Sequence, residues 1–539
     1  MSWMKKLLGI DNRDNLGNIS LKSDEDICPK CGNRKFSYDT YWKESCCQQC
    51  GWTVSGNKAS KSKQVQATSA SRTSGKILIS DLNKRSTIKK SHPLTDSTNL
   101  NDIEFTSEFT HALNLIQSGQ PLVFITGKAG TGKSTFIDLI RLKIRKNVVV
   151  LAPTGVAALN AQGQTIHSFF HFPPTAVDLS AVKQVYNCKL YEKVDILVVD
   201  EVSMMRADLF DAIEKFLRLN ARDASKLFGG VQVVLIGDMF QLPPVVSRTE
   251  EAKLFGSKYL SPYFFSAKSI QEAPLGFIEF TRIFRQADEY FANILNKIRE
   301  AIDTTKVVEE INNNCFATAP LESTPLILTC TNAVASQINT HRLNKLEGVE
   351  HLFEGEIKGS FQIQKEKLPS PFMLKLKIGS QVMFTKNDSE KRWVNGTVGL
   401  VKNISSDIIK VSISTKAKSY IYDVQRVTWD SLAYEYDEIK DKIVTKIIGE
   451  YKQFPLMLAW AVTIHKSQGR TLESIVVDLG KGAFAHGQVY VALSRCRTLE
   501  GIKLERPIRP KDIICDKRII DFHSALRDNQ ENNQILTVG

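Results

Sequence analysis

The stretch that most constrains the fold of this chain is GKAGTGKS at residues 127–134. It follows the apolar run PLVFIT (121–126) and precedes TFIDLI (135–140), which has a helical pattern. A strand, a glycine-rich turn and a helix in this order form a P-loop, whose backbone N–H groups surround phosphate oxygens at the positive end of the helix. The predicted nucleotide-binding residues are Gly127, Lys128, Ala129, Gly130, Thr131, Gly132, Lys133, Ser134 and Thr135, with Lys133 on the β- and γ-phosphates and Ser134 on Mg²⁺.

Similar apolar runs recur along the chain and alternate with helical patterns. The runs are NVVVLAP (147–153), DILVVDE (195–201), VQVVLIG (231–237), PLILT (325–329) and SIVVDLG (474–480). Strands that are apolar on both faces predict parallel sheets covered by helices on both sides. Because 539 residues exceed the size of a single core, the pattern predicts two such α/β domains, with a small β-rich insertion in the second.

Two of these runs end in polar residues at the edge where open α/β sheets bind ligands. VDILVVDE ends in Asp200, which is predicted to bind Mg²⁺, and Glu201, which is predicted to activate the attacking water. LIGDMFQLPPV (235–245) places Gln241 where it could sense the γ-phosphate or that water. The alternative for Gln241 is a loop-capping role.

The charge of the chain favours a polyanionic partner. The formal net charge is +13 and the pI is about 9.1, a balance that is frequent among nucleic-acid-binding proteins. Residues 54–100 are rich in Ser, Thr and Lys, which predicts a flexible basic linker. No long uncharged apolar stretch and no signal peptide is evident, so we expect a cytoplasmic protein with no membrane partner.

Five of the ten cysteines lie between positions 28 and 50, in CPKCG and CCQQCGW. Fifteen residues separate Cys31 from Cys47, within the spacing of a zinc ribbon. Four thiolates in this arrangement would hold a structural Zn²⁺, and the predicted ligands are Cys28, Cys31, Cys47 and Cys50. Cys46 is a competing ligand, and a redox pair is the main alternative to zinc. The partner of this module would be DNA or another protein.

The order of motifs along residues 105–505 resembles the Pif-type (petite integration frequency) DNA helicases of superfamily 1B, which are related to RecD. The motifs are GKAGTGKST, LAPTGVAALNAQGQTIHSFF, VDEVSMM, IGDMFQLPPV, FTRIFRQAD, AWAVTIHKSQGRTL and YVALSRCR. The resemblance implies two RecA-like domains with an SH3-like insertion. It also implies Mg²⁺-dependent ATP hydrolysis between the domains, 5′-to-3′ movement on single-stranded DNA, and unwinding of forked or structured DNA. The family's adenine-reading Gln cannot be placed in TSEFTHALNLIQ, so adenine selectivity is left open.

The resemblance also implies roles for residues outside the P-loop domain. Arg285 and Arg495, both expected from the second domain, would contact the γ-phosphate, and Gln468 and Gly469 would approach the nucleotide. Phe240 would stack on a base. TIHSFF and TIHKSQ repeat a Thr–His spacing, once in each domain. The predicted DNA-binding residues are Pro153, Thr154, Thr165, His167, Phe240, Thr463, His465 and Lys466.

The predicted organisation has seven parts. These are an N-terminal segment (1–25), a zinc ribbon (26–53), the linker (54–100), RecA-like domain 1 (101–275), RecA-like domain 2 (276–396 and 455–510), the SH3-like insertion (397–454) and a C-terminal tail (511–539). Two other functions are alternatives to the helicase hypothesis. One is a DNA translocase without processive unwinding, and the other is a zinc-ribbon adaptor whose ATPase only switches conformation.

Overall fold

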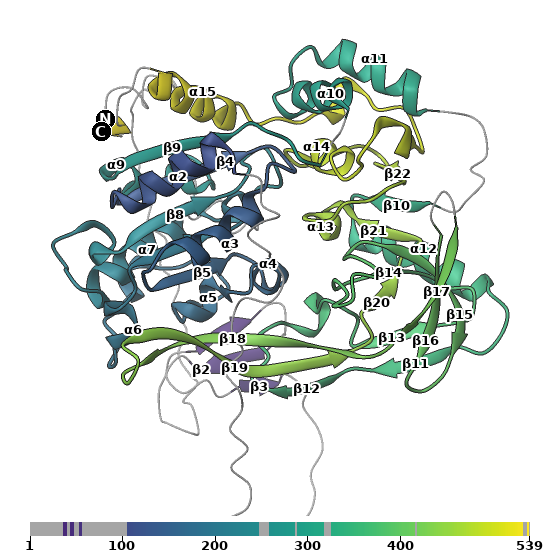
Figure 1. Cartoon of the computed structure of the whole chain (residues 1–539), viewed down its shortest axis with the longest axis horizontal. Coiled ribbons are helices and arrows are strands. Elements are labelled where there is room, and N and C mark those ends of the chain that lie inside the picture. The colour runs from purple at the N-terminus through teal and green to yellow at the C-terminus, as the bar shows by residue number, and fades with distance from the viewer. Residues whose placement is uncertain are drawn as a thin grey trace, which may run out of the picture. The chain divides into compact units, whose positions relative to one another are not determined.

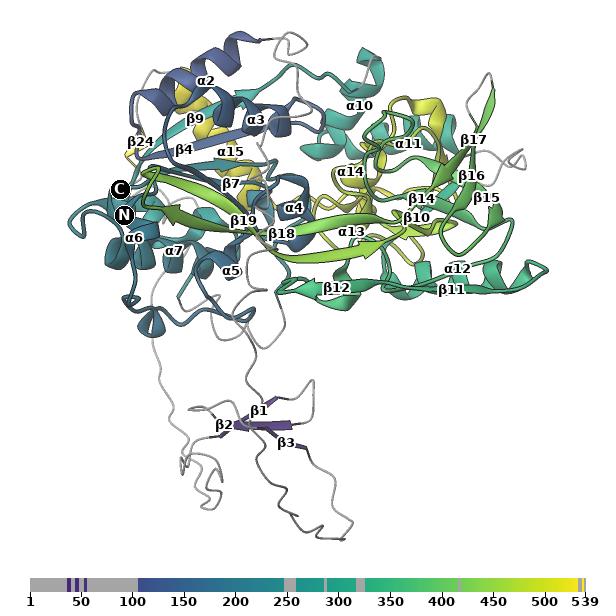
Figure 2. The same cartoon turned by 60° about the horizontal axis from the view of Figure 1, so that its bottom comes forward.

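The computed structural model describes residues 36–39, 44–47, 53–55, 105–246, 258–285, 288–316, 325–414, 418–531 and 536–537. The chain divides into two compact units, Met1–His92 and Pro93–Gly539. In the first unit, strands β1 (Phe36–Asp39), β2 (Glu44–Cys47) and β3 (Thr53–Ser55) form an antiparallel sheet in that order (Figure 2). Cys47 ends β2, whereas Cys28, Cys31, Cys50 and the linker lie outside the described residues. The zinc site therefore stays a prediction.

The second unit begins with the first domain, which is built on a seven-stranded sheet (Figure 1). The strand order is β24-β9-β4-β8-β7-β5-β6, and every pairing is parallel except that of β24 with β9. The strands are β4 (Leu122–Gly127), β5 (Val148–Ala152), β6 (Gln164–Thr165), β7 (Ile196–Val199), β8 (Gln232–Ile236), β9 (Pro274–Phe280) and β24 (Leu536–Thr537). The helices are α2 (Ser107–Gln117), α3 (Lys133–Lys143), α4 (Gly155–Asn160), α5 (Ile166–Phe169), α6 (Lys189–Glu192), α7 (Ala207–Asn220), α9 (Lys268–Glu272) and α15 (Lys517–Glu531).

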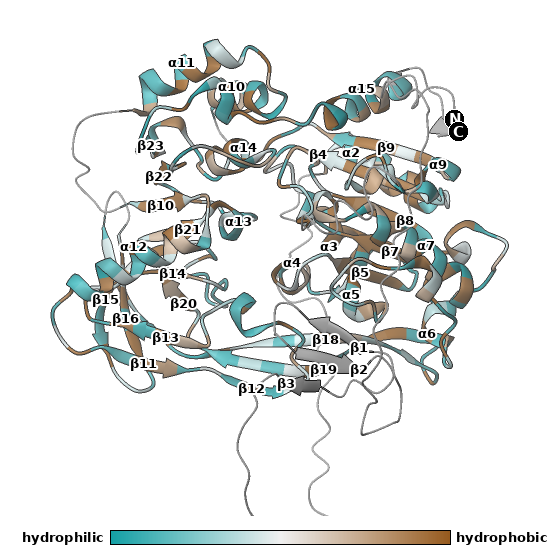
Figure 3. Ribbon diagram, turned by 180° about the vertical axis from the view of Figure 1, so that it is seen from behind, coloured by the Kyte–Doolittle hydropathy of each residue, from teal (hydrophilic) through white to brown (hydrophobic). Residues whose placement is uncertain are grey.

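The central strands are apolar throughout because both of their faces are covered, as Figure 3 shows. Leu122 and Phe124 of β4 face one hydrophobic cluster, and the alternating residues Val123 and Ile125 face another. All four side chains are fully buried. This two-sided burial accounts for the continuous apolar runs in the sequence.

The first domain extends further along the chain than the sequence indicates. Strand β9 pairs in parallel with β4, from Leu122 opposite Leu275 to Gly127 opposite Phe280, so the domain does not end at residue 275. The predicted C-terminal tail is also part of this domain. Phe522 of α15 stacks on Phe265 with 4.4 Å between ring centroids, and β24 pairs with β9.

The second domain has a four-stranded parallel sheet in the order β21-β10-β22-β23. Its strands are β10 (Leu326–Thr329), β21 (Ala461–Thr463), β22 (Ile475–Asp478) and β23 (Ile502–Leu504). Its helices are α10 (Glu289–Arg299), α11 (Thr304–Cys315), α12 (Asn332–Lys345), α13 (Ile464–Ser467) and α14 (Gln488–Leu493).

A β-rich module is inserted in the second domain, and it is wider than the predicted 397–454. A five-stranded antiparallel sheet, ordered β17-β16-β15-β14-β20, surrounds its own apolar core. Its strands are β14 (Gln381–Phe384), β15 (Val398–Ile404), β16 (Ile409–Ser414), β17 (Ser419–Val424) and β20 (Leu456–Leu458). The remaining strands are β11 (His351–Glu354), β12 (Glu356–Gly359), β13 (Met373–Leu376), β18 (Val427–Asp437) and β19 (Lys442–Gln453).

Strands β18 and β19 form a long hairpin whose tip reaches the first domain (Figure 1). Lys189 of α6 and Lys193, which directly follows that helix, pair with Glu438 and Asp441 at this tip, at 2.6 and 2.8 Å. Tyr434 lies further along the hairpin, and its hydroxyl hydrogen-bonds the backbone of Val150 in β5. The hairpin therefore holds the insertion against the first domain.

The predicted fold class, two parallel α/β domains with a β-rich insertion, is confirmed. Within the residues that the structure describes, no helix combines the length and apolarity needed to span a membrane.

Candidate nucleotide site between the two domains

The P-loop joins β4 to α3, as the sequence predicts. Gly130 and Gly132 have φ values of 87° and 84°, which favour glycine, and they curl the backbone in front of the helix. The Lys133 ammonium group donates to the carbonyl oxygens of Gly127 at 2.7 Å and Lys128 at 2.8 Å. Burial lowers the pKa of Lys133. The P-loop backbone therefore surrounds the Lys133 ammonium group and partly removes it from water.

Two adjacent carboxylates lie at the end of β7, on the same edge of the sheet. Burial and the neighbouring Glu201 raise the pKa of Asp200 to about 7, and burial also raises the pKa of Glu201. Glu201 has a φ of 51°, a left-handed conformation that is strained for a residue with a side chain. Crowded, half-buried carboxylates favour a cation, and carboxylate and hydroxyl oxygens are hard ligands. Asp200, and Ser134 at the start of α3, offer oxygen ligands of the kind that Mg²⁺ prefers.

Gln241 is linked to Glu201 through a residue of the second domain. Gln468 follows α13, and its amide nitrogen donates to Glu201 Oε2 and to Gln241 Oε1, both at 3.1 Å. Gln241, at the end of LIGDMFQ, therefore contacts Gln468 of the second domain, and Gln468 also contacts the Glu201 carboxylate. Gly469 is next in the chain, exposed, with a φ of 76°.

The two predicted arginines meet at the cleft but come from different domains. Arg495 follows α14 of the second domain, as expected. Arg285 instead lies in the segment that leaves β9 of the first sheet, against the P-loop, where a Cβ on Gly130 would collide with its own Cβ. Arg285 Nη1 donates to the carbonyl oxygen of Ser494 at 3.5 Å. The prediction that both arginines come from the second domain is therefore wrong for Arg285, because β9 belongs to the first sheet.

Arg495 is 1% exposed, and its guanidinium group lies against α14, the helix that precedes it. Nε donates to Val491 O at 2.8 Å and Nη2 donates to Ser494 Oγ at 2.9 Å. Burial lowers the pKa of Arg495 to about 10, with a further contribution from Arg285. Two neighbouring guanidinium groups opposite Glu201 make the cleft favourable for an anion.

Sequence reasoning missed a buried network at the end of β8. Asp238 accepts hydrogen bonds from Arg299 Nη2 at 3.2 Å and from the Tyr490 hydroxyl at 3.0 Å. Burial opposes ionisation, but Arg299, Lys133 and these hydrogen bonds hold the pKa of Asp238 below its usual range. An acid directly after an apolar run was a visible signal for Asp238. Arg299 and Tyr490 lie within helical patterns and carried no such signal.

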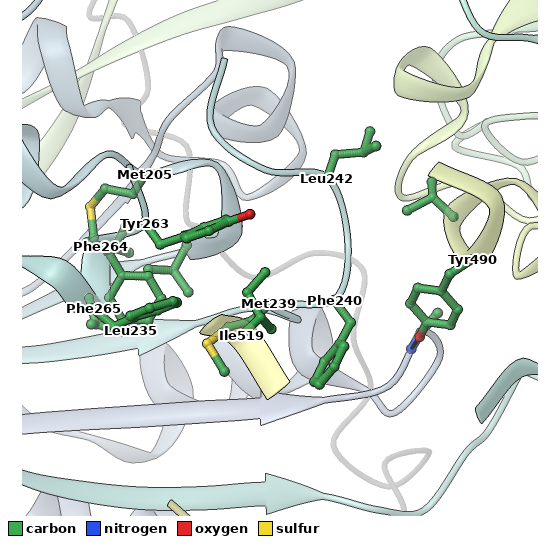
Figure 4. Packing of buried hydrophobic residues seen from close by; sticks show 14 of the residues in the cluster. Met205, Leu235, Met239, Phe240, Leu242, Tyr263, Phe264, Phe265, Tyr490 and Ile519 are labelled. Atoms are coloured by element: carbon green, nitrogen blue, oxygen red, sulfur yellow. Dashed lines mark hydrogen bonds between the residues drawn. The ribbon is translucent and has the colours of Figure 1, made fainter. Parts of the chain in front are cut away.

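Phe240 occupies a different place from the one predicted. Its side chain is 1% exposed and points into the core (Figure 4). The ring packs edge-on against His523 with 5.1 Å between centroids, and the Arg299 guanidinium lies 3.9 Å from its centroid. The prediction that Phe240 stacks on a base is therefore wrong for this structure, because α10 and α15 cover the ring.

The repeated Thr–His spacing corresponds to the same local structure in both domains. Thr165 ends β6 and caps α5, accepting the N–H of Ser168 at 3.3 Å. Thr463 ends β21 and caps α13, accepting the N–H of Lys466 at 3.3 Å. Each threonine is thus an N-cap at a strand-to-helix turn. Thr154 caps α4 in the same manner, directly after Pro153.

The histidines of these turns are partly buried, and burial lowers the pKa of both His167 and His465. They are therefore neutral near pH 7. Lys466 is exposed beside His465. The two turns offer neutral hydrogen-bonding groups and one cation.

Taken together, the P-loop, the paired carboxylates and the arginines of two α/β domains define a P-loop nucleoside triphosphatase with a composite site between RecA-like domains. The family model described as PIF1-like helicase matches residues 104–309. The ATP-dependent DNA helicase Pif1 of Bdellovibrio bacteriovorus is 33% identical over 433 residues, covering 79% of this chain and 92% of that protein. The chain belongs to the PIF1-like helicase family.

Other relatives agree with this assignment. The human ATP-dependent DNA helicase PIF1 is 31% identical over 446 residues, and the match covers 79% of this chain but only 64% of the human protein. The solved structure of Bacteroides sp Pif1 in complex with ADP-AlF4 has a TM-score of 0.71 at 35% identity, covering 79% of this chain and 98% of that one. Bacteroides Pif1 bound to ssDNA has a TM-score of 0.57 at 36% identity, covering 80% and 98%.

Proposed function

We propose that this protein is an ATP-dependent DNA helicase that moves 5′-to-3′ along single-stranded DNA and unwinds duplex, forked or structured DNA. The observation that carries the proposal is the Glu201–Gln468–Gln241 chain, in which a residue of the second domain contacts the carboxylate beside the P-loop. Such a site changes when the domains move, which is what coupling hydrolysis to movement requires. The names of the matched relatives support the same activity.

We infer the roles of the residues around the nucleotide from where they lie in the cleft. Lys133 would neutralise the β- and γ-phosphates, and Glu201 would accept the proton of the attacking water, which Gln241 orients. Mg²⁺, held by Ser134 and Asp200, would supply charge neutralisation on the phosphates. Arg285 and Arg495 would stabilise the charge that develops on the γ-phosphate, with Gln468 and Gly469 lining the nucleotide from the second domain.

We propose that the threonine-capped turns bind the single-stranded DNA. Thr165 and His167 in the first domain, and Thr463, His465 and Lys466 in the second, would contact phosphates or sugars, with Pro153 and Thr154 beside the first turn. Contacts of this kind do not read sequence. One gripping turn in each domain suits a protein that advances when the domains close and open.

The test is unwinding of matched forks by the full-length protein with ATP and Mg²⁺. We expect forks with a single-stranded 5′ tail to be unwound and forks with only a 3′ tail to remain intact, because the family moves 5′-to-3′. Hydrolysis is measured on the same substrates. Unwinding of 3′-tailed forks alone would contradict the polarity. DNA-stimulated hydrolysis without any strand separation would instead identify a translocase, and hydrolysis that ignores DNA would identify a switching adaptor.

We further propose that Cys28, Cys31, Cys47 and Cys50 hold one structural Zn²⁺ in the N-terminal module, whose partner would be DNA or another protein. The cysteine spacing supports this. Metal analysis of the full-length protein should find about one zinc per chain. The Cys28→Ser/Cys31→Ser variant should lose the zinc, whereas Cys188→Ser, at an unpaired cysteine of the first domain, should keep it. A full-length protein without zinc would refute the ribbon.

A further inference from the structure

A single hydroxyl group connects the P-loop to the second domain. Tyr490, labelled in Figure 4, lies on α14. Its hydroxyl accepts the N–H of Ala129 and donates to Asp238 Oδ2, both at 3.0 Å. The side chain is 3% exposed. The three groups come from the P-loop, from the end of β8 and from the second domain, so the position of α14 depends on the position of the P-loop.

The charge of Asp238 does not need this hydroxyl. Arg299 pairs with Asp238 Oδ1, and both of these side chains are fully buried. Removing the hydroxyl leaves that ion pair in place. What is lost is the hydrogen bond from the Ala129 N–H, which among the described residues is the only side-chain hydrogen bond between the P-loop and α14. The hydroxyl therefore acts on the relative position of these two segments.

The segment that directly follows α14 contacts both arginines of the cleft. Arg495 rests on Val491 O and Ser494 Oγ, and Arg285 Nη1 donates to Ser494 O. At the other end of α14, a Cβ on Gly487 would collide with the Phe240 carbonyl oxygen, so the helix lies against the turn that carries Gln241. A shift of α14 at Tyr490 therefore displaces Arg495 relative to the P-loop and changes the contact between Ser494 and Arg285, which stays with the P-loop.

We propose that Tyr490 is a positioning residue that couples the state of the P-loop to the placement of Arg495 and to its distance from Arg285. The inference rests on the proposed function, since it assigns the coupling contact of the same site. A movement of the P-loop changes the Ala129–Tyr490 hydrogen bond, and α14 transmits that change to the second domain and its DNA-gripping turn. Tyr490 touches no substrate in this role.

The test compares Tyr490→Phe with Tyr191→Phe in the full-length chain. Tyr191 is also buried, at 4% exposure, and its hydroxyl donates to Phe169 O at 2.9 Å, away from the P-loop. Tyr490→Phe loses two buried hydrogen bonds and Tyr191→Phe loses one, so thermal unfolding should show small losses for both variants and the larger loss for Tyr490→Phe. With saturating single-stranded DNA, Tyr490→Phe should lower kcat about tenfold and leave KM for ATP within a few-fold, because one buried hydrogen bond to a charged group is worth about that factor. Tyr191→Phe should keep the parent's kcat.

A second measurement does not depend on hydrolysis. The affinity for single-stranded DNA is measured with and without a non-hydrolysable ATP analogue, and the ratio gives the coupling between the two sites. Tyr490→Phe should move this ratio toward one. The inference is overturned if Tyr490→Phe keeps the parent's kcat and coupling ratio, or if both variants lose activity only in proportion to unfolding. A parent protein without DNA-stimulated hydrolysis would overturn the proposed function itself, which is a different result.

Discussion

Replacing Lys133 with alanine is expected to reduce ATP hydrolysis by at least about 100-fold and to abolish unwinding, because a preorganised cation at the phosphates is lost. Within the described part of the chain, the Lys133 ammonium group hydrogen-bonds only to the P-loop itself, at Gly127 O and Lys128 O. Binding of single-stranded DNA should therefore stay close to that of the parent. Steady-state hydrolysis and DNA titrations measure the two effects separately.

Lys143→Ala is the matched control for this experiment. Lys143 ends the same helix, and its ammonium group lies 5.7 Å from the Phe105 ring centroid, remote from the loop. It should hydrolyse ATP like the parent. Turnover of Lys133→Ala within a few-fold of the parent would contradict the P-loop assignment, whatever the control shows.

Replacing Phe240 with alanine is expected to lower the free energy of unfolding by about 3–5 kcal/mol, as for other buried phenylalanines. The ring fills the space between His523 and the Arg299 guanidinium, and its loss leaves a cavity beside a buried ion pair. Thermal unfolding measures the loss. DNA affinity per folded molecule should not change, because the ring is covered.

Phe484→Ala supplies the control, because Phe484 is 62% exposed and its removal leaves no cavity. It should unfold close to the parent's temperature. A Phe240→Ala protein with parental stability and weakened DNA binding would restore the base-stacking role that the structure argues against.

The sequence was sufficient for the parts of the site that one segment builds alone. The P-loop follows from a strand, a short turn and a helix, and the Asp200–Glu201 pair from the end of a strand, so their geometry is local. The Thr–His spacing was visible too, but not that each threonine caps a helix. The apolar runs likewise predicted the central strands, because two-sided burial leaves a visible pattern.

The parts that could not be predicted depend on contacts between distant segments. Strand order is not visible in a sequence, so β9 was placed in the wrong domain and Arg285 with it. Burial of Phe240 follows from α10 and α15, which lie on other parts of the chain. Tyr490 meets Ala129 across 361 residues. Periodicity along the chain cannot reveal such a pairing.

The C-terminal segment has a mechanical consequence. The chain leaves the first domain after β9, builds the second domain, and returns through α15 to place β24 beside β9. Two covalent crossings restrict the second domain in a way that one crossing does not, because rotation about the line between two attachment points is easier than any other. The second domain should therefore rotate mainly about the line between these two crossings. Each cycle of opening and closing should then follow the same path.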